Sequence, residues 1–234
     1  MPNKKVIIDK RMRKIEKQKI QDMGYEIIEI QTNPYVYPEI SSHVDIFACK
    51  VRDEIIVEPS QNLKDISNYV YGEEKVSIQY PQDIKYNVCL IGNIAIHNLK
   101  YTDKILKQKL INNKFELVNT TQGYTNCSIA VIDEKSAIVT DKGLNKILQK
   151  HEIETLYLND KLDIKLLKEN AYSEKNGFIG GCISRLGNKI IVFGDLNKID
   201  FQKKIRNFIY AKGLEVIEFK GLDVIDYGGL IEIE

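Results

Sequence analysis

Four side chains in this sequence could together perform covalent catalysis: one histidine, one cysteine and two aspartates. His43 and Asp45 stand in the tripeptide His-Val-Asp, Cys127 follows a Gly-Tyr-Thr-Asn segment, and Asp226 precedes Tyr-Gly-Gly. A thiolate is a strong nucleophile, and a histidine is the usual group that takes its proton. Carboxylates hold a planar guanidinium through bidentate, charge-assisted hydrogen bonds. The set is suited to attack by a thiolate on a guanidinium carbon, with His43 moving the proton.

The H-x-D tripeptide stands directly before the apolar run Ile46–Val51, which we predict to be a strand. Residues two apart on a strand share a face, so His43 and Asp45 could reach one ligand together. A polar strand start without function is the alternative interpretation. The other histidines favour structural roles, because His97 lies in a predicted buried strand and His151 follows a predicted helix among charged residues.

The four cysteines differ in their surroundings. Cys49 and Cys89 lie inside apolar runs and are expected in the core, where a free cysteine behaves as a small hydrophobe. Cys127 and Cys182 follow glycine-containing turns, and both are candidates for the nucleophile. Asp226, beside two glycines, is either a site carboxylate or a turn residue. No C-x-x-C pair occurs, which argues against a disulfide framework or a structural zinc site and favours a reducing cytoplasm.

The elements that must position these residues recur along the chain. A short β-branched run followed by a polar residue appears five times, at intervals of roughly 40–50 residues, which is typical of propellers and arrays. The five runs, predicted to be buried strands, are Lys4–Asp9, Glu54–Pro59, Asn93–Asn98, Ser136–Asp141 and Lys189–Asp195.

After each run the apolar period changes to that of a helix, with a polar residue at the N-cap position. The predicted helices are Lys10–Met23, Leu63–Tyr71, Thr102–Asn112, Lys142–Lys150 and Lys198–Lys212. A second strand follows each helix, at Tyr25–Ile30, Lys75–Gln79, Phe115–Val118, Ile153–Leu158 and Leu214–Phe219. A third strand then follows a small or polar cluster, and the candidate site residues fall in these clusters, including Tyr86-Asn87 in the second unit.

The two ends of the chain complement each other. The last unit stops after its third strand, whereas Lys4–Asp9 has the closing strand's pattern and no unit before it. If this strand completes the last unit, the ends join in a ring and no sheet edge stays exposed. We therefore predict one domain over 1–234, with units near 10–59, 60–98, 99–141, 142–195 and 196–234 plus 4–9. A WD-type propeller lacks the helices, a doubly wound sheet needs a glycine-rich phosphate loop, and an open solenoid leaves the complementary ends unexplained.

The composition is that of an ordinary globular protein. Lys and Arg number 34 against 33 Asp and Glu, so no general attraction to nucleic acid or to a membrane surface is expected. No apolar run approaches the roughly 18 residues of a membrane span, and the N-terminus lacks the apolar core of a signal peptide. Nothing implies a metal or an organic cofactor, and the sequence gives no indication of the oligomeric state.

The repeats and the H-x-D, cysteine and acid–glycine segments resemble the guanidino-group-modifying enzyme superfamily, the pentein fold. The resemblance implies an α/β, five-bladed αβ propeller with pseudo-fivefold repeats. Read cyclically, Asp226, His43-Val-Asp45 and Cys127 follow the family's order, which implies a circularly permuted chain. This chain departs from the family pattern where Tyr227 separates the acid from the glycines.

The resemblance implies that Cys127 is the nucleophile, His43 the general acid and base, and Asp45 and Asp226 the guanidinium carboxylates. We expect their neighbours Asn126, Gly181, Cys182 and Gly228 to contact the substrate. The expected function is a cysteine-dependent hydrolase or amidinotransferase acting on a small guanidine-type compound, as in arginine and agmatine deiminases and dimethylarginine hydrolases. The alternative is a non-catalytic protein of the same fold that binds a ribosome, another protein or a small ligand.

Overall fold

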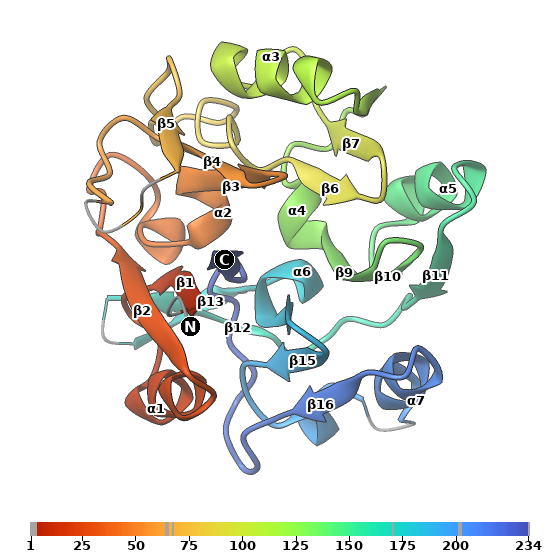
Figure 1. The fold of residues 1–234 in the computed structure, drawn as a ribbon. Helices are drawn as coiled ribbons and strands as arrows, with labels where there is room; N and C mark the ends of the chain where they lie inside the picture. The colour runs from red at the N-terminus through yellow and green to blue at the C-terminus, as the bar shows by residue number, and fades with distance from the viewer. Residues whose placement is uncertain (1–3, 64–65, 67, 170, 201–202, 234) are drawn as a thin grey trace.

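The strands of the computed structural model lie in small sheets around a common centre (Figure 1). The structure describes residues 4–63, 66, 68–169, 171–200 and 203–233. Within these residues there are five three-stranded sheets and one two-stranded sheet. No helix in the described part of the chain is long and apolar enough to cross a membrane.

All five three-stranded sheets have the same internal order. A central strand pairs antiparallel with one neighbour and parallel with the other. The central strands are β1 (Lys4–Asp9), β4 (Glu54–Val57), β7 (Ile94–His97), β10 (Ser136–Val139) and β15 (Lys189–Val192). Their antiparallel partners are β17 (Ile231–Ile233), β3 (Ala48–Val51), β6 (Cys89–Ile91), β9 (Ile129–Asp133) and β14 (Ile183–Leu186). Their parallel partners are β2 (Tyr25–Ile30), β5 (Tyr69–Tyr71), β8 (Glu116–Asn119), β11 (Glu154–Tyr157) and β16 (Glu215–Ile217).

The central strands form the core, as their apolar sequences predict. All four residues of β7 and of β10 are buried, and the last four residues of β1 are buried as well. Each fully buried Val or Ile contributes about 1.5–3 kcal/mol relative to an exposed one. The five predicted first strands are therefore confirmed, with each C-terminal end at or just before the predicted one.

Four longer helices lie at the outer edge of the molecule (Figure 1). They are α1 (Lys14–Asp22), α3 (Lys104–Asn112), α5 (Lys142–Lys150) and α7 (Lys204–Ala211), each between a central strand and its parallel partner. The predicted polar N-cap is confirmed for α5, where the carboxylate of Asp141 accepts a hydrogen bond from the backbone N–H of Leu144. α3 is capped in the same way by Asp103, rather than by Asn98 at the end of the predicted strand. α1 and α7 begin later than predicted.

The second unit differs from the prediction. Part of the predicted helix Leu63–Tyr71 (residues 64, 65 and 67) lies outside the described residues, and its end is the strand β5 rather than a helix. The predicted strand Lys75–Gln79 is wrong, because β5 occupies the parallel position. A buried carboxylate organises this loop: Glu58 accepts hydrogen bonds from the backbone N–H groups of Ser60 (2.8 Å) and Val76 (3.4 Å).

One-turn helices stand where three of the third strands were predicted to begin. They are α2 (Val44–Phe47), α4 (Thr125–Ser128) and α6 (Ile179–Cys182), directly before β3, β9 and β14, and they surround the centre of the molecule (Figure 1). The predicted strand Ile46–Val51 starts only at Ala48. The prediction that His43 and Asp45 share a strand face is therefore wrong, because His43 caps α2 and Asp45 lies on its turn.

The first and last described strands lie in one sheet. β1 pairs antiparallel with β17, with Lys5 opposite Ile233 and Ile7 opposite Ile231, and pairs parallel with β2. The predicted pairing of the first strand with the last is confirmed. It brings the segment after Asp226 beside the segment before α2, and Val44 N donates to the Tyr227 carbonyl at 3.4 Å.

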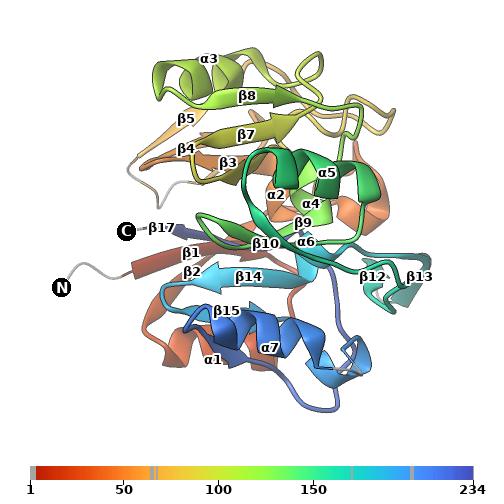
Figure 2. The same cartoon turned by 90° about the vertical axis from the view of Figure 1, so that its right-hand side faces the viewer.

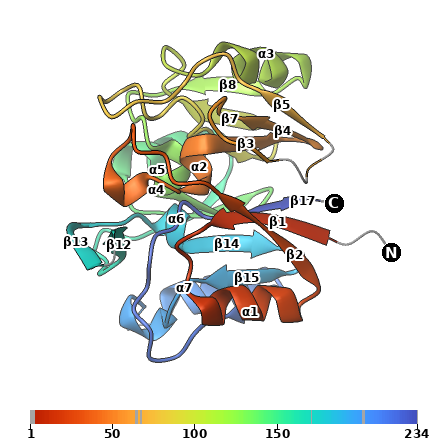
Figure 3. The same cartoon turned by 90° about the vertical axis from the view of Figure 1, so that its left-hand side faces the viewer.

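A hairpin that the sequence did not predict lies on the opposite face from the chain ends (Figures 2 and 3). It consists of β12 (Lys165–Lys168) and β13 (Ala171–Asn176) and packs against the short helix η1 (Pro38–Ile40). A second short helix, η2 (Leu196–Lys198), precedes α7. The Arg11 guanidinium joins the hairpin to η1, because it donates to the carbonyls of Leu167 (3.3 Å) and Pro38 (2.9 Å). The hairpin thus forms one wall of the cavity described next.

Candidate active site

A cavity of about 230 Å³ contains three of the four predicted catalytic residues. His43, Cys127 and Asp226 line it, each at most 2% exposed. They come from the segment before α2, from α4 and from the segment before β17, so the fold brings together the first, third and last units. Asp45, the fourth predicted residue, contacts the cysteine directly.

The Cys127 thiol is held between two polar side chains. It donates a hydrogen bond to Asp45 Oδ2 at 2.8 Å and accepts one from Asn87 Nδ2 at 3.1 Å. Asn87 Oδ1 also accepts from the backbone N–H of Asn126 (2.9 Å), so this amide positions the first turn of α4. The sequence marked Asn87 as part of the equivalent cluster of the second unit but assigned it no role. Its place in a cluster equivalent to those of the other site residues was the signal that could have identified it.

His43 is completely buried and faces a carboxyl group. Its Nδ1 lies 3.7 Å from Asp226 Oδ1. Neither ring nitrogen has a hydrogen-bond partner among the described residues, and the same holds for Asp45 Oδ1. Buried polar atoms are normally hydrogen-bonded, so unpartnered ones beside a cavity indicate a place for a polar ligand.

The protonation states in the empty site follow from burial. Burial raises the pKa of Asp45 to about 6, and burial together with the nearby charge of Asp45 raises the pKa of Asp226 to about 7. Burial and the two carboxylates raise the pKa of the Cys127 thiol well above its ordinary value. Burial and the Arg11 guanidinium hold the pKa of His43 well below its ordinary value. A cation among these groups would lower the pKa of the carboxyls and of the thiol, because opposite charges favour the ionised forms.

The Asp226 carboxylate is fixed by the backbone around it. It accepts hydrogen bonds from the N–H groups of Phe178 (2.8 Å) and Gly228 (2.9 Å). A Cβ at Gly181 would collide with this carboxyl group. A Cβ at Gly228, whose φ is +70°, would lie 2.6 Å from both Asp45 Oδ1 and His43 Cβ. These two glycines therefore permit the close approach of the acid to the H-x-D segment.

The other residues predicted to contact substrate lie around the site in different ways. Asn126 Nδ2 donates to Asp45 Oδ2 at 3.3 Å, so it supports the carboxylate that holds the thiol. Cys182 is fully buried, and its thiol donates to the Ile179 carbonyl at 3.4 Å. Cys182, Gly181 and Gly228 are not among the residues that line the cavity. Their contact with a substrate stays a prediction.

The remaining histidines and cysteines have structural surroundings. His97 is buried and its Nδ1 lies 2.7 Å from Thr102 Oγ1. His151 lies 3.7 Å from a Glu116 carboxylate oxygen at the surface. Cys49 and Cys89 are buried free thiols within strands, as predicted. No group of three or more His, Cys, Asp and Glu side chains in the described part of the chain is arranged to hold a metal ion.

The outer walls of the cavity were not predicted. Their side chains come from η1, from the residues that cap η1, α4 and α6, and from the hairpin, and they include Tyr37, Glu39, Tyr124, Leu166, Lys175 and Phe178. Tyr124 and Phe178 stand beside the glycine-containing clusters, which was the one available signal for them. The hairpin carries no catalytic motif and could not be recognised from the sequence.

Comparisons with solved structures find similar folds in two enzyme structures. A dimethylarginine dimethylaminohydrolase, in an adduct with S-methyl-L-thiocitrulline, matches with a TM-score of 0.57 and 9% identity, over 94% of this chain and 92% of that chain. The enzyme of Pseudomonas aeruginosa, complexed with citrulline, matches with a TM-score of 0.55 and 10% identity, over 94% and 91%. At this identity the likeness shows the fold.

A family comparison identifies the chain's own family. Residues 7–231 match DUF6873, described as a family of unknown function, and the chain belongs to it. No curated protein matches the sequence.

Proposed function

We propose that this chain is a cysteine-dependent enzyme that hydrolyses a small guanidine or amidine compound, or transfers its amidino group, through a covalent thiouronium intermediate. One observation carries the proposal. The Cys127 thiol, bonded to Asp45, shares a buried cavity with Asp226 and with a His43 ring that has no hydrogen-bond partner among the described residues. The fold, similar to that of dimethylarginine dimethylaminohydrolase, supports the substrate class.

The proposed scaffold is a closed five-bladed αβ propeller in a single domain over residues 1–234. The same strand order in five sheets and the pairing of β1 with β17 support it. Residues 1–3 and 234 lie outside the described part of the chain. The cyclic order of the acid, the H-x-D segment and the cysteine supports a circularly permuted chain. Four free cysteines support a reducing, cytoplasmic location.

In the proposed mechanism the substrate cation lies between Asp45 and Asp226, which accept its N–H groups. Asp45 then no longer holds the thiol, whose proton passes to His43 as the sulfur bonds to the guanidinium carbon. His43 gives this proton to the leaving nitrogen, and the C–N bond breaks to release an amine or ammonia. Water then attacks the thiouronium carbon and gives a proton to His43. The C–S bond breaks and the sulfur takes that proton back, which leaves a urea-type product. An amine in place of water makes the reaction an amidino transfer.

The first test is the reactivity of the thiols with 2-chloroacetamidine, a cationic electrophile of the substrate's shape. We expect Cys127 to be alkylated far faster than the other three cysteines, as read by mass spectrometry of peptides. His43→Ala should abolish the difference, whereas Cys49→Ser should leave it unchanged, because the Cys49 thiol lies in the core within β3. Equal alkylation of all four thiols, or alkylation only on unfolding, would contradict the proposal. Ammonia and ureido-product assays with arginine, agmatine and methylated arginines then test turnover.

A second candidate is a protein of the same fold that binds a cation without turnover, as a ligand sensor or as a partner-binding protein. The raised pKa of the Cys127 thiol favours it, since a thiol that stays protonated is a poor nucleophile. Tight binding of a guanidine with no alkylation of Cys127 at pH 8 would select this candidate.

A further inference from the structure

The cavity opens along a row of aromatic rings. Tyr124 and Phe178 line it, with ring centroids 6.2 Å apart and planes 25° apart. Tyr80 continues the row outward, with its centroid 6.0 Å from that of Tyr124. Phe178 is 38% exposed and Tyr80 is 47% exposed, so both ends of the row reach the surface, and the half-buried Tyr124 lies between them. Exposed aromatic rings beside a cavity indicate a contact surface for a ligand.

Each ring is fixed relative to the reacting groups. Tyr124 stands three residues before the nucleophile, and its hydroxyl donates to the carboxylate of Asp83. The backbone N–H of Phe178 donates to Asp226 at 2.8 Å. A Cβ at Gly123 would lie 3.0 Å from Tyr80 atoms, so the Tyr80 ring rests against the chain just before α4. A substrate held by Asp226 and Cys127 must therefore place its substituent along these rings.

The charged groups of the cavity wall already neutralise each other. Lys175 Nζ lies 3.2 Å from Glu39 Oε1, which also accepts a hydrogen bond from Ser173 Oγ at 3.0 Å. The same ammonium lies 5.1 Å from the centre of the Tyr37 ring. Among the described residues that line the cavity, no other Lys or Arg occurs. A carboxylate on the substrate's tail would have to compete with Glu39 for the Lys175 ammonium, so it gains little from that charge.

We infer that the substrate is a guanidine or amidine whose substituent is uncharged and apolar, a flat or unbranched alkyl or aryl group, and that Tyr124 and Phe178 determine this specificity. This inference rests on the proposed function of the same site. It separates the chain from an enzyme for an amino acid, whose tail carries both an ammonium and a carboxylate.

The test compares four electrophiles that alkylate the same sulfur: 2-chloroacetamidine, its N-butyl and N-benzyl derivatives, and the derivative on the side-chain nitrogen of ornithine. In each reaction a C–S bond forms, the C–Cl bond breaks, chloride leaves and the thiol proton goes to His43 or water. We expect the second-order rate constant for Cys127 to be at least about tenfold higher for the butyl and benzyl compounds than for the ornithine compound, from aromatic contacts alone. An ornithine compound that reacts fastest overturns the inference but leaves the proposed function standing. Failure of all four probes to label Cys127 refutes both.

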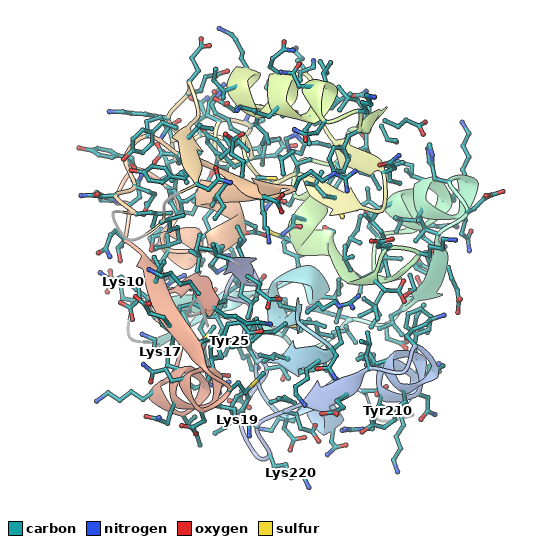
Figure 4. The ribbon with its side chains drawn as sticks, in the orientation of Figure 1. Lys10, Lys17, Lys19, Tyr25, Tyr210 and Lys220 are labelled. Atoms are coloured by element: carbon teal, nitrogen blue, oxygen red, sulfur yellow. The ribbon has the colours of Figure 1, made fainter. Side chains whose placement is uncertain are left out.

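Substitutions test the role of the rings. Phe178→Leu and Tyr124→Leu should each lower the ratio of the benzyl rate constant to that of unsubstituted chloroacetamidine by about three- to tenfold. Tyr210→Leu is the control, because this half-exposed tyrosine lies on α7 at the edge of the molecule (Figure 4) and should leave the ratio unchanged. Lys175→Met should not slow the ornithine compound selectively. A selective loss there, or unchanged ratios in both ring variants, would contradict the inference.

Discussion

Replacing Asp226 by Asn should change the free energy of unfolding in a way that depends on pH. The difference between the variant and the natural protein should favour the variant more at pH 8 than at pH 5. Burial, with the nearby charge of Asp45, raises the Asp226 pKa from 3.8 to about 7 in the folded protein. The folded state therefore binds this proton more tightly than the unfolded chain does. The resulting stabilisation is complete below pH 3.8 and is lost as the pH rises through 7. Asparagine carries no charge at either pH, so it removes this dependence.

The size of the effect follows from the two pKa values. At pH 5 the group is protonated in the folded protein and mostly ionised in the unfolded chain, and at pH 8 it is ionised in both. Linkage then gives a loss of about 2–3 kcal/mol in the free energy of unfolding between pH 5 and pH 8. Asparagine also loses one hydrogen bond from the N–H groups of Phe178 and Gly228, because its amide nitrogen cannot accept. That loss is the same at both pH values and cancels from the comparison.

The assay is urea unfolding followed by far-UV circular dichroism at pH 5, 6, 7 and 8, which suits a chain without tryptophan. Asp45→Asn should show a smaller change of about 1–2 kcal/mol, because the pKa of Asp45 rises only to about 6. Asp53→Asn, at an exposed turn, is the control for removal of one surface carboxylate.

One result would refute the reasoning. If the difference between Asp226→Asn and the natural sequence does not change with pH, Asp226 is already ionised at pH 5 in the folded protein. That outcome would mean that Asp226 and a protonated His43 form an ion pair across their 3.7 Å separation. The neutral imidazole inferred from burial would then be wrong as well.

Three further substitutions test how the site is held. Gly181→Ala should destabilise the fold by about 1–3 kcal/mol in urea unfolding, because its Cβ would collide with the buried Asp226 carboxyl group. Gly143→Ala at the start of α5 is the control and should be neutral or stabilising. Arg11→Met should cost about 3–5 kcal/mol by the same assay, since the buried Asp9 carboxylate loses its ion pair with the guanidinium and keeps only the hydrogen bond from the backbone N–H of residue 11. Asn87→Ala removes a hydrogen bond that lowers the pKa of the Cys127 thiol, so the alkylation rate at pH 8 should fall about tenfold.

The sequence predicted the repeat because its buried strands have an unmistakable composition. Runs such as Lys4–Asp9 and Ser136–Asp141 place β-branched residues where both faces are covered, and polar residues mark their ends. Helices with side-chain caps, such as α3 and α5, were predicted almost to the residue. The prediction for the loop after β4 was wrong because the loop's conformation depends on hydrogen bonds to Glu58 from residues up to 18 positions away. Local periodicity does not contain such contacts.

The proximity of His43, Asp45, Cys127 and Asp226 was predictable because residue types and cyclic order constrain it, whereas its geometry was not. The strand-face reasoning for His43 and Asp45 was wrong, yet both residues reach the site. The one-turn helix α2 turns Asp45 toward Cys127 while His43, at the N-cap, faces Asp226. A single turn of four residues is too short for any periodic signal. The hairpin β12–β13 and the residues with which it lines the cavity could not be predicted either, because residues that line a cavity have no regular spacing along the sequence.

The site consists of two halves that are held together in different ways. Cys127, Asn87 and Asp45, from the third, second and first units, are joined by direct side-chain hydrogen bonds. Asp226 reaches His43 because β17 pairs with β1 and the Tyr227 carbonyl accepts the N–H of Val44. The approach of the acid to the imidazole therefore depends on the sheet that contains both ends of the chain, whereas the contact of the thiol with its carboxylate does not. Loosening that sheet should therefore separate Asp226 from His43 before it separates Cys127 from Asp45.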